Sequence, residues 1–351
     1  MKFAIAAPCY VDFYKDAIEL EQLGFDGLWL FDSPVVYSDV YATLALIATN
    51  TSRLRIAPGV AVARNRVAPV TAHSIATINR LAPGRVALGF ATGNTARRAM
   101  GMPPVSLREF TAEAITIRAL LGGGTAPYRE GDRETLVKLG SPSRGFISLE
   151  PRIPLIMAAT APKALKIAGE VGDGLITSGS NPDQLKSWIE IAKAARPSER
   201  ARDPFEVVAM VGVYVTAPGE SADSAGPRAA LGPWILAHLG LRLDTFKGPA
   251  DKMDPVLADF AREVASRPHP KHLWIYETYQ TGVPEDLRRF VTPAAIHATC
   301  LCGPPDFIAD GIGKVVAAGA DEIILRPHGD GRMLVNYRRF AETVMRPLRG
   351  R

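Results

Sequence analysis

Residues 23–30 read Leu-Gly-Phe-Asp-Gly-Leu-Trp-Leu, so a helical stretch stops at a glycine, an aspartate follows, and a short apolar run begins. Residues 171–176 (Val-Gly-Asp-Gly-Leu-Ile) and 318–325 (Ala-Gly-Ala-Asp-Glu-Ile-Ile-Leu) repeat this order. Glycine tolerates the left-handed conformation that ends a helix, and such short apolar runs are typical of strands buried on both faces. The repeated order of helix, turn and buried strand predicts a parallel α/β protein.

Eight strand-like segments can be read along the chain outward from these turns. They are residues 2–7, 27–31, 54–62, 85–90, 153–158, 174–177, 205–216 and 322–325. Strands that each precede a helix, eight times over, favour an α/β fold of the (β/α)8 TIM-barrel type. The competing doubly wound sheet typically carries Gly-x-Gly-x-x-Gly after its first strand, whereas residues 8–11 contain no glycine.

Two segments depart from the alternation of strands and helices. Residues 125–152 are polar and rich in glycine, proline and arginine, and we interpret them as a loop or hairpin inserted after the fourth helix. Residues 220–300 are mostly helical and exceed what one crossover needs, which predicts a second insertion after the seventh strand. We therefore expect a single TIM-barrel domain over residues 1–351 that carries both insertions.

The composition excludes several classes of protein. The chain has 351 residues, of which 47% are hydrophobic and 22% charged, as in soluble globular proteins. No apolar stretch approaches the ~18 residues of a membrane span. The basic residues behind the net charge of +5 are spread out, which argues against nucleic-acid binding. The three cysteines form no disulfide framework, so we expect a cytoplasmic protein.

No metal site is expected from the sequence. The six histidines show no His-x-His pattern at a strand end, which disfavours a metal-dependent barrel hydrolase. Cys300 and Cys302 are separated only by Leu301, which is not the spacing of a zinc site.

The candidate functional residues are those that follow the predicted strands, because the chemistry of a TIM barrel lies where its strands end. Two of these segments, residues 91–95 and 177–181, combine hydroxyl groups with a glycine that lets backbone N–H groups approach an anion. The second also precedes a helix, whose N-terminus favours negative charge. Each loop alone can be a simple turn, but as a pair they favour a bound phosphate.

Six stretches carry a resemblance to a known family. They are residues 24–32, 43–48, 55–60, 84–93, 154–165 and 168–174, and with the last strand and helix they cover roughly the first 200 residues and the C-terminal end. In this order the chain resembles the bacterial luciferase-like superfamily, and within it the branch of methylenetetrahydromethanopterin reductase and other coenzyme F420-dependent oxidoreductases. The resemblance implies a TIM barrel with an insertion after the seventh strand, in agreement with the strand count.

The resemblance also implies a cofactor site at the strand ends, with F420 or FMN held by its phosphate and a non-prolyl cis peptide near residues 60–63 behind the ring. The implied cofactor contacts are Asp32, Val60, Ala61, Arg64, Thr92, Gly93, Asn94, Thr95, Ala159, Thr160, Thr177, Ser178, Gly179 and Ser180. F420 carries a tail of carboxylates that basic side chains would suit. Basic candidates for that tail or the phosphate are Arg64, Arg66, Arg97, Arg98 and Lys163.

Asp32 matches an aspartate of the family that faces the cofactor ring and often precedes a histidine. Ser33 and Pro34 follow it here, so the proton carrier is open among Asp32 itself, Tyr10 and His328. Two other residues have structural interpretations: Glu113 is expected to form an ion pair with an arginine, and Trp29 is expected to pack inside the barrel.

Three functions follow, each acting on or binding a small organic molecule. The leading hypothesis is hydride transfer between C5 of F420 and an organic substrate. The alternatives are an FMN-dependent monooxygenase that uses reduced flavin and O2, and a non-catalytic flavin-binding barrel. The resemblance further implies a homodimer formed through the early helices. Aromatic residues of the second insertion either cover a substrate or pack together: Trp234, Trp274, Tyr276, Tyr279 and Phe290.

Overall fold

The computed structural model describes residues 1–350 except 141, 279, 327 and 330–332. The chain divides into two compact units. The first comprises Met1–Met210 and Lys314–Leu325, and the second comprises Val211–Gly313 and Arg326–Arg351. Two elements cross the boundary, the strand β10 (Glu206–Val215) and the helix α12 (Pro305–Ala317).

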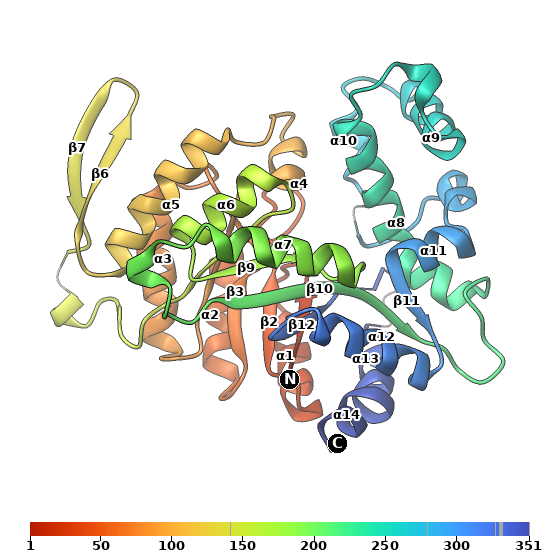
Figure 1. Cartoon of the computed structure of the whole chain (residues 1–351), viewed down its shortest axis with the longest axis horizontal. Coiled ribbons are helices and arrows are strands. Elements are labelled where there is room, and N and C mark those ends of the chain that lie inside the picture. The colour runs from red at the N-terminus through yellow and green to blue at the C-terminus, as the bar shows by residue number, and fades with distance from the viewer. Residues whose placement is uncertain (141, 279, 327, 330–332, 351) are drawn as a thin grey trace. The chain divides into compact units, whose positions relative to one another are not determined.

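The first unit contains the predicted barrel (Figure 1). Its strands are β1 (Lys2–Ala7), β2 (Gly27–Leu30), β3 (Arg55–Pro58), β4 (Ala61–Val62), β5 (Leu88–Ala91), β8 (Leu155–Ala158), β9 (Gly174–Ser178), the first half of β10, and β12 (Glu322–Leu325). They pair in the order β3-β2-β1-β12-β10-β9-β8-β5-β4. Because β3 and β4 are consecutive and Ile56 of β3 also bridges to Val86 before β5, the sheet closes on itself. The TIM-barrel prediction is confirmed.

The third predicted strand, residues 54–62, is wrong as one continuous strand, because a cis peptide bond between Gly59 and Val60 separates β3 from β4. The bond joins Gly59 to Val60, the first residue of the stretch near which a cis peptide was expected. Glycine is required at position 59, where an added Cβ would lie 2.5 Å from the Cβ of Trp29. Gly89 of β5 faces the same crowding, since its Cβ would meet the Pro58 carbonyl oxygen at 2.4 Å.

The barrel interior is filled by side chains from most of the strands, mainly alanine, valine and isoleucine, as expected of a packed barrel. The buried members are Ala4, Ala6, Trp29, Ala57, Ala87, Ile156, Ile176, Val208 and Ile324. Trp29 is fully buried, which confirms its predicted packing role, and its Nε1–H donates to Glu322 Oε1 at 2.8 Å. A partner for that N–H is what a buried indole needs.

The aspartates of the three repeated turns make the same contacts at the amino ends of the strands. Each backbone N–H donates to the carbonyl of a residue at the start of a neighbouring strand, and each carboxylate accepts that residue's N–H. The carboxylate contacts are Asp26 with Phe3 at 2.7 Å, Asp173 with Leu155 at 3.0 Å and Asp321 with Val207 at 2.8 Å. The aspartate therefore ties the turn to the adjacent strand, which gives the recurring motif a structural role.

The helices of the first unit follow the strands. They are α1 (Phe13–Leu23), α2 (Val40–Asn50), α3 (Ala68–Leu81), α4 (Asn94–Arg98), α5 (Leu107–Leu121), α6 (Pro162–Val171) and α7 (Pro182–Ala194). Helix α1 ends at Gly24, whose φ of 95° is left-handed as the turn requires. Ser106 caps α5 by accepting the N–H of Glu109 at 3.3 Å, the spacing of a capping box. Helix α4 was not predicted.

Residues 125–138 form a two-stranded antiparallel hairpin, β6 (Thr125–Glu130) and β7 (Arg133–Lys138). In Figure 1 it extends from the end of α5 as a long yellow ribbon. Only Ala126 of its twelve strand residues is buried, so the hairpin contributes little to the barrel core.

The second unit is mostly helical. Its helices are α8 (Ala225–Thr245), α9 (Pro255–Ser266), α10 (His272–Ile275), α11 (Pro293–Thr299), α13 (Met333–Phe340) and α14 (Arg346–Arg349), joined by short 3₁₀ and π turns. A strand absent from the sequence prediction, β11 (Cys300–Gly303), pairs in parallel with the second half of β10. The core of this unit gathers Leu231, Ile235, Phe260, Phe290 and Ile296 around α8.

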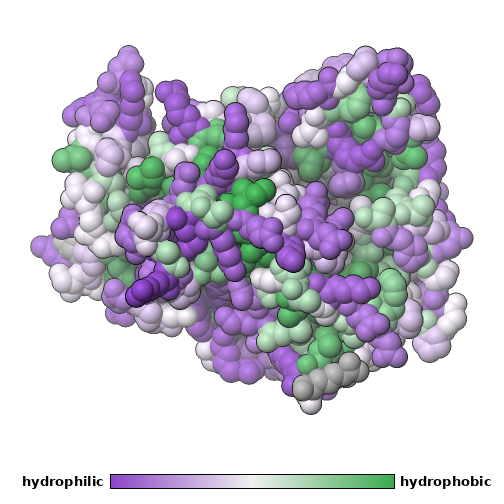
Figure 2. Space-filling model, in the orientation of Figure 1, coloured by the Kyte–Doolittle hydropathy of each residue, from purple (hydrophilic) through white to green (hydrophobic). Residues whose placement is uncertain are grey.

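The surface view in Figure 2 shows hydrophilic residues over most of the visible face, with hydrophobic residues scattered between them. Among the residues that the structure describes, no helix is long and apolar enough to cross a membrane.

Candidate functional site

The predicted site residues of the first unit lie at the carboxyl ends of neighbouring strands. Asp32 follows β2, Val60 and Ala61 lie between β3 and the end of β4, and Gly93 follows β5. Ala159 and Thr160 follow β8, and Ser178 ends β9. Because these strands are parallel neighbours in a closed sheet, their carboxyl ends form one rim. The fold therefore brings these residues to the same end of the barrel.

Asp32 is held by an arginine that the sequence did not identify as its partner. The Arg66 Nη1 group donates to both carboxylate oxygens of Asp32 at 3.0 Å, and Asp32 is only 5% exposed. Arg66 also pairs with Asp39, the N-terminal cap of α2, and its guanidinium lies 4.9 Å from the ring centre of Tyr41. Burial raises the pKa of Asp32, and Arg66 opposes this rise without cancelling it.

Two uncharged side chains, the thiol of Cys9 and the phenol of Tyr41, lie near this ion pair. The Cys9 thiol donates to the Phe31 carbonyl at 3.2 Å, and burial together with the charge of Asp32 raises its pKa. Burial likewise raises the pKa of Tyr41, whose buried hydroxyl has no hydrogen-bond partner among the described residues. Neither group titrates near neutral pH, so Asp32 and Arg66 carry the charge of this part of the rim.

The loop after β4 presents Arg64, Asn65 and Arg66 in sequence. Arg64 adopts a left-handed φ of 67°, and its N–H donates to Glu113 Oε2 at 3.2 Å while its Nε lies 3.9 Å from Glu113 Oε1. The predicted ion pair of Glu113 with an arginine is thereby confirmed. Both amide atoms of Asn65 are buried without a hydrogen-bond partner in the described part of the chain. A buried amide without partners is costly, which marks a position where a ligand can supply them.

The first candidate phosphate loop differs from its prediction. Gly93 has a φ of 77°, and an added Cβ would lie 2.1 Å from Val62 Cγ1. Asn94 and Thr95 are not loop residues, because they form the first turn of α4. The Asn94 side chain accepts the Nε–H of Arg98 at 2.6 Å. For a phosphate, this segment therefore has the backbone N–H of Gly93 to donate, whereas the side chain of Asn94 is already bound to Arg98.

The second candidate phosphate loop has the predicted form. Thr177 Oγ1 donates to the Ala159 carbonyl at 2.7 Å, which joins the ends of β8 and β9. The hydroxyls of Ser178 and Ser180 lie 3.3 Å apart across Gly179. Asn181 then caps α7 by accepting the N–H of Gln184 at 3.1 Å. Hydroxyl groups and a capped helix start thus lie side by side at the rim.

Tyr10 and His328 both have hydrogen-bond partners within the chain. The Tyr10 hydroxyl donates to Asp16 in α1, and burial followed by this contact raises the pKa of Tyr10. His328 belongs to the second unit, where its Nε2 lies 2.7 Å from the Val213 carbonyl and its Nδ1 lies 2.7 Å from Asn336 Nδ2. The carbonyl can only accept, so Nε2 of His328 carries the proton in that hydrogen bond.

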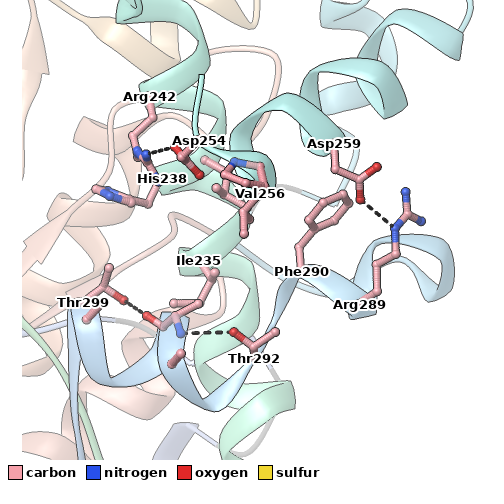
Figure 3. Close-up of a pocket in the computed structure, with 15 residues that line it drawn as sticks. Ile235, His238, Arg242, Asp254, Val256, Asp259, Arg289, Phe290, Thr292 and Thr299 are labelled. Atoms are coloured by element: carbon pink, nitrogen blue, oxygen red, sulfur yellow. Dashed lines mark hydrogen bonds and ion pairs between the residues drawn. The ribbon is translucent and has the colours of Figure 1, made fainter. Parts of the chain in front are cut away.

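The second unit contains a cavity of about 540 Å³ between α8, α9 and α11 (Figure 3). Figure 3 shows Arg242 facing Asp254 on one side and Arg289 facing Asp259 on the other, with Val256 and Phe290 between them. In each ion pair the arginine and the aspartate neutralise each other's charge. The rest of the lining is mostly apolar. Of the aromatic residues proposed to cover a substrate, Phe290 lines this cavity, Trp234 stacks 3.5 Å from Arg326, and Tyr279 lies outside the described residues.

The chain matches the family described as luciferase-like monooxygenase over residues 14–322. It is 35% identical over 192 residues to 5,10-methylenetetrahydromethanopterin reductase of Methanolobus tindarius, covering 53% of this chain and 56% of that protein. The reductase of the same name from Archaeoglobus fulgidus is 26% identical over 315 residues, 87% of this chain and 86% of the relative. An F420-dependent glucose-6-phosphate dehydrogenase of Kineococcus radiotolerans is 33% identical over 180 residues, 48% of this chain and 52% of that protein.

The chain thus spans about half the length of two of these relatives and most of the third. Among solved structures, the coenzyme F420-dependent tetrahydromethanopterin reductase of Methanopyrus kandleri superimposes with a TM-score of 0.67 at 20% identity, over 99% of both chains. An F420-dependent secondary alcohol dehydrogenase superimposes with a TM-score of 0.69 at 18% identity, over 99% of this chain and 98% of that one. At such identities these likenesses establish the fold.

Proposed function

This chain belongs to the luciferase-like monooxygenase family, and from that premise we propose that it is a coenzyme F420-dependent oxidoreductase acting on a small organic substrate. The observation that carries the proposal is the barrel rim, where the buried Asp32, the segment joining β3 to β4 and two polar loops follow neighbouring strands. The names of relatives support the choice of F420, because one curated relative and two solved structures are F420-dependent enzymes.

The rim fits a phosphorylated cofactor. The side-chain amide of Asn65 has no hydrogen-bond partner among the described residues, so a ligand can bind it. The backbone at Gly93 and the hydroxyls of Ser178 and Ser180 suit a phosphate. Val60 and Ala61, next to Asp32 on the rim, would lie against the ring system. When bound, F420 supplies the carbon, C5 of its deazaflavin, that exchanges a hydride with the substrate.

Asp32 is our choice for the proton carrier. When a substrate hydroxyl is oxidised, its carbon loses a hydride and its oxygen loses a proton, and a carboxylate oxygen of Asp32 accepts that proton. Arg66 opposes the rise that burial causes in the pKa of Asp32, so it favours the ionised carboxylate that acts as a base. Tyr10 already donates to Asp16, and both ring nitrogens of His328 are engaged, which leaves Asp32 as the better of the three candidates.

The second candidate is an FMN-dependent monooxygenase, and a specific observation favours it. Most of the basic residues considered for the carboxylate tail of F420 are already engaged: Arg66 with Asp32 and Asp39, Arg64 with Glu113, Arg97 with the Pro103 carbonyl and Arg98 with Asn94. Lys163 is exposed, and it forms no ion pair within the described part of the chain. A site with few cations for the tail suits FMN, which has none.

Oxygen dependence separates the two functions. We expect the purified protein, supplied with F420 and a panel of small alcohols and aldehydes, to turn over equally under argon and under air. A monooxygenase given reduced FMN must stop under argon, because O2 is its co-substrate. Turnover that requires O2 would therefore replace our first proposal by the second, and tight binding without any turnover would favour the non-catalytic barrel.

A further inference from the structure

The hairpin β6–β7 leaves the outer edge of β7 without a partner strand in the described part of the chain. Its two strands are joined by a two-residue turn, Gly131 and Asp132, with Glu130 opposite Arg133. All six residues of β7 are exposed or half-buried, and Leu136 is 72% exposed. Large apolar side chains on open strand edges invite pairing with another chain.

Two contacts fix which backbone groups of β7 face that open edge. Pro127 lies opposite Leu136, and proline has no N–H to donate into the hairpin. The Pro127 carbonyl points away from β7, because it accepts the hydroxyl of Thr116 from α5 at 3.0 Å. The Pro127–Leu136 pair is therefore a non-hydrogen-bonded pair, and the N–H and C=O of Leu136 face outward. By the alternation of an antiparallel ladder, those of Glu134 and Lys138 do so as well.

These three outward positions are complementary to a second copy of themselves. If two β7 strands run antiparallel about a twofold axis at Leu136, each Leu136 exchanges both backbone hydrogen bonds with its counterpart. The same register sets Glu134 opposite Lys138 twice, so opposite charges meet on both sides of the axis. A shift by two residues would set Glu134 or Lys138 against Leu136 and lose these charge pairs.

The side chains of this register also form an apolar strip. Leu136 and Pro127 are cross-strand neighbours on one face of the hairpin, and the twofold axis would continue them as Pro127, Leu136, Leu136 and Pro127 across four strands. The exposed surface of Leu136 is thereby covered. Charged residues on a strand edge can instead prevent pairing with another chain. Reversing the charges of Glu134 and Lys138 distinguishes attraction of a second copy from protection of the edge.

We propose that β7 is a homotypic contact, through which two copies of this chain join their hairpins into one four-stranded antiparallel sheet centred on Leu136. This surface is separate from the early helices through which a family homodimer is expected. The proposal does not depend on the cofactor or the substrate, because no residue of β7 is among the proposed cofactor contacts.

Charge reversal tests the register directly. E134K and K138E each place like charges opposite one another in a self-pair, so we expect each variant to have half the mass of the wild type in light scattering. The double variant E134K/K138E restores opposite charges and should recover the wild-type mass. An equimolar mixture of the two single variants should also recover it, because one copy then carries two positive charges on this edge and its partner carries two negative ones.

The control is E190K, which makes the same charge change at an exposed position of α7. It should keep the wild-type mass, and circular dichroism should report unchanged folding in every variant. Equal masses for wild type and both single variants would overturn the proposal and favour the edge-protecting role. Failure of the double variant and of the mixture to recover the larger mass would also overturn it, since the charges would then act outside this register.

Discussion

Asp32 and Arg66 form the buried ion pair on which the proposed chemistry of the barrel rim depends. Asp32 is 5% exposed, and this burial raises the pKa of its carboxyl group, while Arg66 with two contacts of 3.0 Å opposes the rise. The sequence offered both residues as rim candidates, but they are 34 positions apart and nothing in their spacing pairs them. The closure of the barrel brings them together, so sequence reasoning named the residues and missed the interaction.

Replacing Arg66 should therefore destabilise the protein strongly. R66Q leaves Asp32 buried without its cation, and breaking one side of a buried pair costs about 3–5 kcal/mol of unfolding free energy. D39N is the matched control, because it removes the exposed partner of Arg66 while asparagine can still cap α2. We expect less than about 1 kcal/mol from D39N in urea unfolding. Equal losses for the two variants would show that Asp32 is not the dependent partner.

The pH dependence of R66Q activity should move in one direction. Removing Arg66 raises the pKa of Asp32 further, so a higher pH is needed to ionise the proposed base. The acidic limb of the kcat/KM profile should therefore shift to higher pH than in the wild type. A limb at the same pH in both proteins would argue that another group titrates there.

Asp32 should matter far more for turnover than Tyr10. D32N removes the proposed base and should lower kcat by about a hundredfold or more, with cofactor affinity measured separately by fluorescence. Y10F should stay near the wild-type kcat, because the Tyr10 hydroxyl donates to Asp16 in α1. A large loss in Y10F with little loss in D32N would reverse these assignments.

At the scale of elements, the repeated glycine–aspartate turn made the order of the barrel strands predictable. Buried apolar runs and helix-ending glycines are local signals, so the eight barrel strands could be numbered from them. The short helix α4 was missed because Asn-Thr-Ala-Arg-Arg is too brief to show a helical period, and β11 because Cys-Leu-Cys-Gly is equally brief. The break after Pro58 was missed in the strand assignment because the apolar run continues through it, although the resemblance implied a cis peptide near residues 60–63.

The turn at Asp173 should contribute to the acid sensitivity of the barrel. Burial would raise the pKa of Asp173, but the Leu155 N–H and the guanidinium groups of Arg152 and Arg118 lower it overall. A pKa lowered on folding gives stability that is present above the unfolded-state value of about 3.9 and is lost as pH falls through the folded-state value. D173N should therefore be less stable than wild type at neutral pH, and the difference should shrink on acidification below about pH 4 in thermal unfolding. A constant difference would contradict this.

Gly93 should be irreplaceable at the end of β5. G93A forces a left-handed residue to carry a Cβ that would lie 2.1 Å from Val62 Cγ1, so the first phosphate loop must move. We expect a lower melting temperature and at least tenfold weaker cofactor binding by titration, on the order of 1.4 kcal/mol. G140A is the matched control, because a Cβ there meets nothing within 4 Å. Wild-type affinity in G93A would remove this loop from the site.

At the scale of the whole molecule, the sequence predicted a barrel with two insertions and could not predict its division into two units. The boundary crosses β10 and α12 inside regular elements, where composition does not change. His328 shows the consequence, since its place after β12 suggested a rim residue while its hydrogen bonds belong to the second unit. We also propose that the protein forms at least a homodimer, and a pure monomer in light scattering would contradict that.

The central claim is that the barrel rim binds coenzyme F420. The most direct measurement is a parallel fluorescence titration of the purified apoprotein with F420 and with FMN under the same conditions. We predict saturable F420 binding in the micromolar range, weaker binding of FMN, and loss of the F420 signal in G93A but not in G140A. Micromolar binding of FMN with none of F420 would contradict the account.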